Sequence, residues 1–285
     1  MITTSNLATP TRAPRKPSGT VRLASIDVEW TKNYRIKNGN RPFCYSVVWL
    51  DLPARAPRQA DLADVPFHFT SVYVEDADEQ PALVRSAANA LRTATNSADL
   101  ITGHQLCSDL AVLAATADRP QPTIDQARAS WKQRNAPAEG DPRYLDTRFD
   151  AGHLLTGTSR RLVDVCTELR LDVTQPELRG TSMTALHRRW LTDADATARE
   201  KISVLNVRHS LSTAYVAAHA AGLGHWAPEG LNVNRVLAAT TAGAWDWLTS
   251  PTFHTLLGEP CPSATAPRSP SREPRPPARP PSSTP

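Results

Sequence analysis

The sequence of 285 residues is long enough for one large domain or two small ones. Its net charge of +4 belongs to the two ends, because residues 1–20 carry +3 and residues 258–285 carry +2, which leaves −1 for the body. The charge therefore does not indicate a strongly basic nucleic-acid groove. No stretch has the roughly 18 consecutive apolar residues of a membrane span, and the N-terminus lacks the apolar segment of a signal peptide, so we expect a cytoplasmic protein with no membrane partner.

Both ends of the chain have compositions that disfavour a packed core. Residues 258–285 contain 10 of the 25 prolines and no Val, Ile, Leu or aromatic residue. Such a segment buries too little apolar surface to offset the entropy lost on ordering. We therefore expect disordered tails at 1–20 and 258–285, a folded domain over 21–224 and a helical extension over 225–257.

The first part of the folded domain predicts an antiparallel meander. Runs rich in β-branched and aromatic residues predict strands over 21–29, 43–52 and 65–75. An Asn-Gly turn signal separates the first two runs, which favours antiparallel pairing between them.

The pattern then changes to alternating helices and strands. Helical periodicity over 79–96 and 106–117 brackets a short strand at 99–104, and this strand–helix alternation implies parallel pairing in the same sheet. We predict an α/β fold with a mixed five-stranded sheet and helices on both faces. The remaining predicted segments are a helical piece at 124–134, a strand that becomes a helix at 144–155, and helices at 159–171 and 181–191. Residues 196–224 are predicted as one long helix or a broken pair of helices.

Two acids lie inside the first predicted strand, in the stretch LASIDVEW (23–30). Side chains alternate along a strand, so Asp27 and Glu29 point to the same side, about 6–7 Å apart. Two carboxylates in this arrangement repel each other unless a cation lies between them, and Mg²⁺ is typically held by one or two carboxylates. The pair therefore suits a metal ion, although solvated acids at a strand end are the simpler structural interpretation.

A third acid, Asp109, lies in the first turns of the helix that begins within GHQLCSD (103–109). Favourable interaction with the positive end of the helix dipole explains an acid at this position without any function. The order of the elements adds a second interpretation, because Asp109 directly follows a short apolar strand of the same sheet.

These motifs and their order resemble the DEDD superfamily of 3′–5′ exonucleases, which has a ribonuclease H-like fold. The resemblance covers roughly residues 21–222. Asp27 and Glu29 correspond to the family's first motif, and Asp109 corresponds to the second, with Gln105 in place of the usual Asn. The resemblance implies two divalent ions, Mg²⁺ or Mn²⁺, held by four acids, and hydrolysis of the terminal phosphodiester.

The third motif departs from this pattern. His209 stands where the residue that orients the attacking water belongs, but the residue four positions later is Thr213 and the next is Ala214, where the family has Asp. Residues 209 and 213 share a helix face, so Thr213 is at best a neutral oxygen ligand. Either the site is active with one or two ions, with the fourth acid replaced by Thr213 or by another carboxylate, or the domain is degenerate and binds nucleic acid or a replication or repair protein. The candidate replacement acids are Asp146, Asp150, Asp193 and Asp195.

Aromatic residues near the acids are candidates for stacking on terminal bases. Trp30, Phe43 and Tyr45 are the predicted stacking residues and Gln105 a further substrate contact, although such aromatic side chains more often belong to the core. The predicted function is metal-dependent 3′–5′ exonuclease-like hydrolysis of single-stranded DNA or RNA ends. The predicted catalytic residues are Asp27, Glu29, Asp109 and His209, and the predicted metal ligands are Asp27, Glu29, Asp109 and Thr213.

Overall fold

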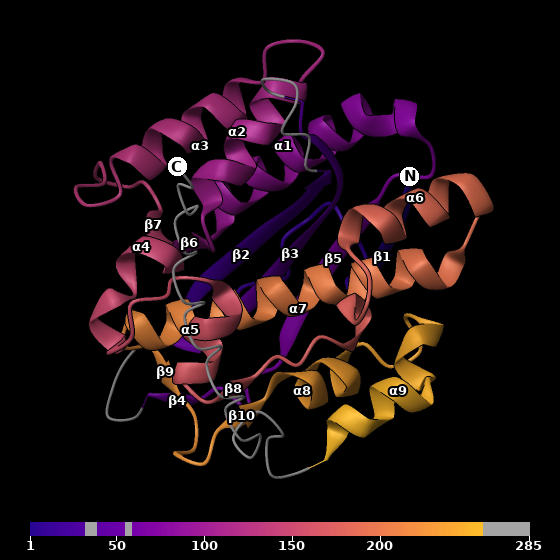
Figure 1. Cartoon of the computed structure of the whole chain (residues 1–285). Helices are drawn as coiled ribbons and strands as arrows, with labels where there is room; N and C mark the ends of the chain where they lie inside the picture. The colour runs from indigo at the N-terminus through magenta and orange to yellow at the C-terminus, as the bar shows by residue number, and fades with distance from the viewer. Residues whose placement is uncertain (32–38, 55–58, 259–285) are drawn as a thin grey trace, which may run out of the picture.

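A mixed sheet of six strands forms the centre of the protein in the computed structural model, which describes residues 1–31, 39–54 and 59–258 (Figure 1). The strand order is β1-β5-β3-β2-β6-β7, and helices cover both faces. The arrangement is a mixed α/β fold consistent with the ribonuclease H-like class. The strands are β1 (Ile2–Ser5), β2 (Thr20–Thr31), β3 (Arg41–Pro53), β5 (Phe67–Tyr73), β6 (Leu100–Gly103) and β7 (Arg143–Asp146).

The meander and the parallel crossover are both confirmed. β2 pairs antiparallel with β3, and β3 pairs antiparallel with β5. β6 then pairs parallel with β2, and β7 pairs parallel with β6. Because β6 pairs only with Leu23–Ser25, the part of β2 that carries Asp27 and Glu29 extends beyond β6.

β1 corrects two predictions, the disorder of residues 1–20 and the count of five strands. Ile2–Ser5 pair antiparallel with β5 and make the sixth strand. The terminal ammonium group of Met1 also forms an ion pair with Glu75, 2.6 Å away. Composition underestimated this segment because the open edge of β5 offers a row of backbone hydrogen bonds that a short β-branched stretch can use. The tail predicted at 258–285 lies outside the described residues, apart from Gly258.

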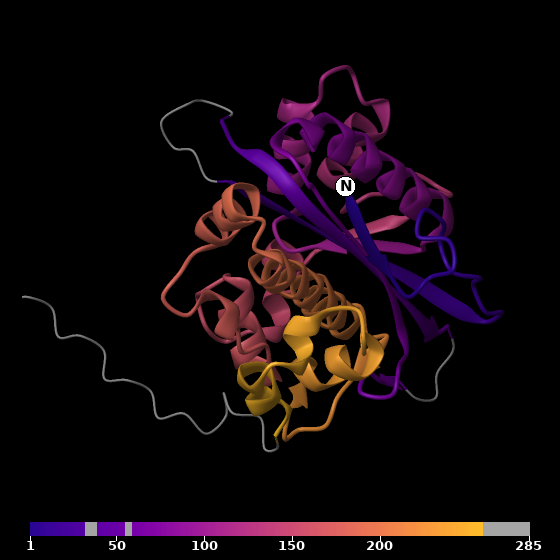
Figure 2. The ribbon, with the colours of Figure 1, turned by 90° about the vertical axis from the view of Figure 1, so that its right-hand side faces the viewer.

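Three helices cover one face of the sheet: α1 (Gln80–Ser97), α2 (Leu106–Thr116) and α3 (Pro122–Lys132). Ala24, Ile26 and Val28 of β2 belong to the same buried cluster as apolar residues of these helices. Figure 2 shows the sheet between this group and the orange and yellow helices of the C-terminal half.

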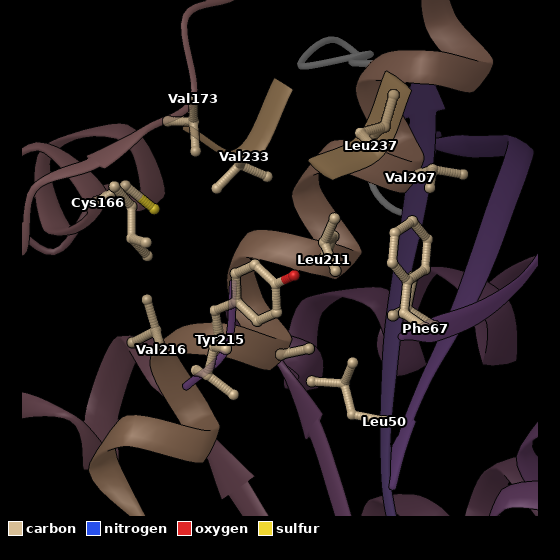
Figure 3. Close-up of a cluster of buried hydrophobic side chains, with 14 of the residues drawn as sticks. Leu50, Phe67, Cys166, Val173, Val207, Leu211, Tyr215, Val216, Val233 and Leu237 are labelled. Carbon is tan, nitrogen blue, oxygen red and sulfur yellow. The ribbon is translucent and has the colours of Figure 1, made fainter. Parts of the chain in front are cut away.

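The other face is covered by α7 (Ala196–Ala220), which forms as one helix of 25 residues. The C-terminal extension packs over α7, with α8 (Val233–Thr240) and α9 (Pro251–His254) contributing to the same core. Figure 3 shows this core, in which Leu211 and Tyr215 of α7 lie near Leu50 and Phe67 of the sheet. A helix enclosed between a sheet and a covering layer is buried on most sides, which explains why buried residues occur all around α7.

The remaining elements are short and connect these layers. Among the described residues, no helix combines the length and the apolar character needed to cross a membrane. The helix predicted over 159–171 forms as α5, which begins at Leu162 and ends at Glu168. The shorter helices and strands are α4 (Thr147–Asp150), α5 (Leu162–Glu168), α6 (Met183–Asp193), β4 (Ala60–Asp61), β8 (Leu171–Asp172), β9 (Gly224–His225) and β10 (Leu231–Asn232), and the 3-10 turns are Ala77–Glu79, Gly152–Leu154, Pro176–Leu178, Asp246–Thr249 and Thr255–Leu257.

Candidate metal centre

The two acids of LASIDVEW lie on the face of β2 that α7 covers. Ile26 and Val28 point to the opposite face and are buried there, as the alternation of a strand requires. The pairing with β3 shifts by one residue between Glu29 and Trp30, which is a β-bulge. Bulges often occur beside functional sites, where they change the direction of a side chain.

Asp27, Glu29 and His209 form a compact cluster. One ligand atom from each lies within 4.8 Å of the other two. Nδ1 of His209 is 3.0 Å from Glu29 Oε1 and 3.7 Å from Asp27 Oδ2. The side chains are 14%, 13% and 18% exposed for Asp27, Glu29 and His209, so the cluster is largely screened from water and still reachable from it.

The pKa values of this cluster reflect crowded negative charge. Burial, followed by the charge of Asp27, raises the pKa of Glu29, and the hydrogen bond with His209 opposes this effect. Burial alone would lower the pKa of His209, but the carboxylates of Asp27 and Glu29 raise it to about 10. His209 is the cation that balances the pair when no metal ion is bound.

Asp109 lies close enough to the cluster to be affected by its charge. Its side chain is 2% exposed, and its Oδ2 has no hydrogen-bond partner. Burial and then the charges of Asp27 and Glu29 raise its pKa well above the usual value, while the backbone N–H of Val28 opposes the shift. Asp109 is not one of the three residues within 4.8 Å of one another, so it borders the cluster from α2.

Asp146, in the stretch YLDT (144–147) at the end of β7, fixes the start of α2. The Asp146 carboxylate accepts hydrogen bonds from the backbone N–H groups of Gln105 and Leu106, at 2.8 and 2.9 Å. A Cβ on Gly103 would lie 3.0 Å from the carbonyl oxygen of Ile26, so glycine permits the close approach of β6 and β2. Asp146 therefore acts as a positioning group for the helix that carries Asp109.

None of the proposed replacement acids joins the cluster in the described part of the chain. Asp146 is satisfied by backbone N–H groups and by Trp131 Nε1, and Asp150 is paired with Arg134. Asp195 caps α7 and is paired with Arg189, and Asp193 is exposed at the end of α6.

Thr213 is buried on α7, and its hydroxyl has no hydrogen-bond partner. It lies one helical turn beyond His209 and two turns beyond Asn206. Asn206 and Ser210, on the same face, both contact the sheet: Asn206 through Asp27 and Ser210 through Ser46. The free hydroxyl of Thr213 therefore belongs to the sheet-facing side of α7, where the third motif was predicted.

Two polar contacts of the cluster were not predicted from the sequence. Nδ2 of Asn206 donates to Asp27 Oδ2 at 2.6 Å, and the side-chain amide of Gln175 lies 2.9 Å from His209 Nε2. Asn206 precedes His209 by three residues, so a search for polar residues on the same helix face would have found it. Gln175 lies in the loop before the Pro176–Leu178 turn, and no local pattern marks it.

The predicted stacking residues lie in different surroundings. Phe43 is fully buried and stacks on His187 with ring centroids 4.1 Å apart, and Tyr45 is 3% exposed and hydrogen bonded to Ser86. Neither ring has a face on which a base could stack. Trp30 is partly buried against the core, and Gln105 directly precedes α2 in the left-handed conformation with its amide donating to Ser108.

The donor set fits a divalent cation. Carboxylate oxygens suit Mg²⁺ and Mn²⁺, and an imidazole nitrogen is compatible with Mn²⁺ and softer metals. In addition, Asp109 offers a buried oxygen without a hydrogen-bond partner beside the cluster.

Comparison with protein-family models gives no match to this chain, and comparison with curated proteins gives none either.

Proposed function

We propose that this protein is a metal-dependent 3′–5′ exonuclease-like hydrolase of single-stranded nucleic acid ends. The observation that supports it best is the cluster of Asp27, Glu29 and His209 at the end of β2. Two carboxylates on one face of a buried strand are costly without a cation, and His209 is the only cationic group in the cluster. A site built to hold a divalent ion accounts for this arrangement.

The residues would divide the work by position. Asp27, Glu29 and Asp109 would hold the ion, which when bound supplies Lewis-acid activation of the phosphodiester and of a water molecule. His209 would orient that water, because Gln175 fixes Nε2 while Nδ1 faces the acids. The proposed substrate class comes from the resemblance of the motifs to DEDD exonucleases.

One observation favours a second candidate function. Among the described residues the cluster holds two acids, with Asp109 beside it, so the negative charge available for two ions is smaller than in the four-acid pattern. A domain that binds a nucleic-acid end or a repair protein without cleaving it would need no such charge.

The test is degradation of a 5′-labelled single strand of DNA or RNA, in Mg²⁺, in Mn²⁺ and in EDTA. The wild type should produce a ladder of shortened strands in metal and none in EDTA. Asp27→Asn should be at least about 100-fold slower, because losing even a residue that supports a metal ligand costs 10- to 100-fold. The matched control is Asp125→Asn, which removes an acid that is 65% exposed and should leave the rate unchanged.

Equal rates for the wild type and Asp27→Asn would assign the activity to a contaminant and reject the enzyme. Binding of the strand without shortening, in any metal, would support the second candidate function. Neither binding nor shortening would reject both.

A further inference from the structure

The first turn of α4, directly after β7, presents a cation, Arg148, that has no carboxylate partner among the described residues. Arg148 donates from Nη1 to the carbonyl oxygen of Arg160 at 3.2 Å, and within the described ranges it forms no ion pair. Other arginines near it do have carboxylate partners, such as Arg134 with Asp150 at 2.9 Å. An unpaired guanidinium is a natural phosphate ligand because its fork of donors matches phosphate oxygens.

The next residue, Phe149, presents an exposed aromatic ring. It is 49% exposed and is the only aromatic among the large hydrophobic residues exposed in the described part of the chain. The ring packs against two neighbours. Its centroid lies 5.8 Å from that of Trp131 in an edge-on arrangement, and the Arg134 guanidinium lies 5.8 Å from its centroid. A fixed ring loses little entropy when a ligand stacks on it.

Hydrogen bonds connect this surface to His104, which directly follows β6, the strand beside β2. His104 bonds through Nδ1 to Thr147 at 3.0 Å and through Nε2 to the Arg160 carbonyl oxygen, which also accepts from Arg148. The charges of Asp27, Arg148 and His209 all act on the pKa of His104, which burial lowers to about 4. Gly103, the residue before His104, lies against the carbonyl oxygen of Ile26, so His104 is near both the first turn of α4 and the end of β2 that carries Asp27 and Glu29. Figure 1 shows α4 following β7 at the end of the sheet.

We propose that Arg148 and Phe149 bind the substrate strand beside the metal centre, with the guanidinium on a phosphate and the ring stacked on a base. This assignment rests on the nucleic-acid substrate of the proposed function. The proposed path of the substrate strand runs from the acids of β2, past His104, onto the first turn of α4. One cation beside one exposed ring matches the alternating phosphates and bases of a single strand. Such a site needs no basic groove, in agreement with the net charge of −1 over residues 21–257.

The test is binding of short 5′-fluorescein oligothymidylate and oligouridylate, followed by fluorescence anisotropy in EDTA so that no cleavage occurs. Arg148→Ala should raise Kd about tenfold or more, as for a lost hydrogen bond to a charged group, and should reduce the slope of log K against log salt by about 0.7. Phe149→Ala should raise Kd about tenfold with the slope unchanged, because stacking releases no counterion.

Matched controls separate these roles from general charge and from folding. Arg161→Ala removes a charge of the same kind from a side chain that is 79% exposed, and it should leave Kd within about twofold. Arg148→Lys should keep the salt slope, and Phe149→Leu, which keeps an apolar group over Trp131, should still lose affinity. Thermal melting of each variant confirms that it is folded.

The outcomes distinguish this inference from the proposed function. Equal losses for Arg148→Ala and Arg161→Ala, or wild-type affinity in both Phe149 variants, would overturn the assignment even if the protein degrades strands. No binding by the wild type at low salt would overturn it as well. Binding that depends on Arg148 and Phe149 in a protein that never shortens the strand would keep the assignment and reject the hydrolase. The DNA and RNA arms show which strand is preferred.

Discussion

A buried ion pair lies one residue from His209, and breaking it should lower the stability of the fold. Arg208 and Glu177 have fully buried side chains and form two hydrogen bonds, at 2.9 and 2.8 Å. Arg208 Nε also donates to Asn234 at 2.6 Å, and Trp247 Nε1 donates to Glu177 at 2.9 Å. Despite burial, the charge of Arg208 and these hydrogen bonds hold the pKa of Glu177 below its usual value. The pair thus joins α7 to the Pro176–Leu178 turn, which follows Gln175, and to the C-terminal extension.

Glu177→Gln keeps the shape of the side chain and leaves the Arg208 guanidinium buried without its counter-charge. Breaking one partner of a buried pair costs about 3–5 kcal/mol, so we expect a loss of that size in the free energy of unfolding. Arg208→Met should cost a similar amount, and the double variant should lose less than the two single losses combined, because no charge is then left unpaired.

Urea unfolding at pH 7, followed by tryptophan fluorescence and circular dichroism, measures these losses. The matched control is Arg85→Gln, which breaks an exposed pair with Asp118 and should change stability by less than about 0.5 kcal/mol. Losses below about 1 kcal/mol in both single variants would show that solvent screens the pair, and would refute the reasoning.

Three further predictions follow from the site and the core. Burial lowers the pKa of His187 from 6.5 to about 4, so the folded state should lose stability as the pH falls from 6.5 towards 4, by up to about 1.4 kcal/mol per pH unit. His187→Gln should reduce the dependence of the free energy of unfolding on pH, as measured by urea unfolding. An unchanged pH dependence would contradict the assignment. Gln175→Ala should lower the rate of strand shortening about tenfold, with Kd for the strand unchanged, because it releases Nε2 of His209; a change in Kd alone would indicate a substrate contact instead. Thr213→Asp should lower the melting temperature of the metal-free protein and raise its Mn²⁺ affinity in calorimetry, since it buries a fourth carboxylate beside Asp27, Glu29 and Asp109. Lower stability without tighter binding would place residue 213 outside the metal site.

The sequence determined the parts of the protein that depend on local patterns. Alternation and β-branched runs located the strands of the meander, and the change of period located the crossover that makes β6 and β7 parallel. The same alternation placed Asp27 and Glu29 on one face, because the period of a strand leaves no other choice. The resemblance to the third motif singled out His209 in the helix predicted over 196–224, and the structure brings it to these acids.

Tertiary structure decided everything that depends on which surfaces meet. β1 formed because the edge of β5 was open, which no composition of residues 1–20 shows. Phe43 was predicted to stack on a base, but packing against His187 buried it, while Phe149 remained exposed. Gln175 reaches His209 from 34 positions away in the chain. Local sequence fixes the direction of a side chain relative to its own element, whereas its neighbours are chosen by long-range packing, and the chemistry of a site depends on both.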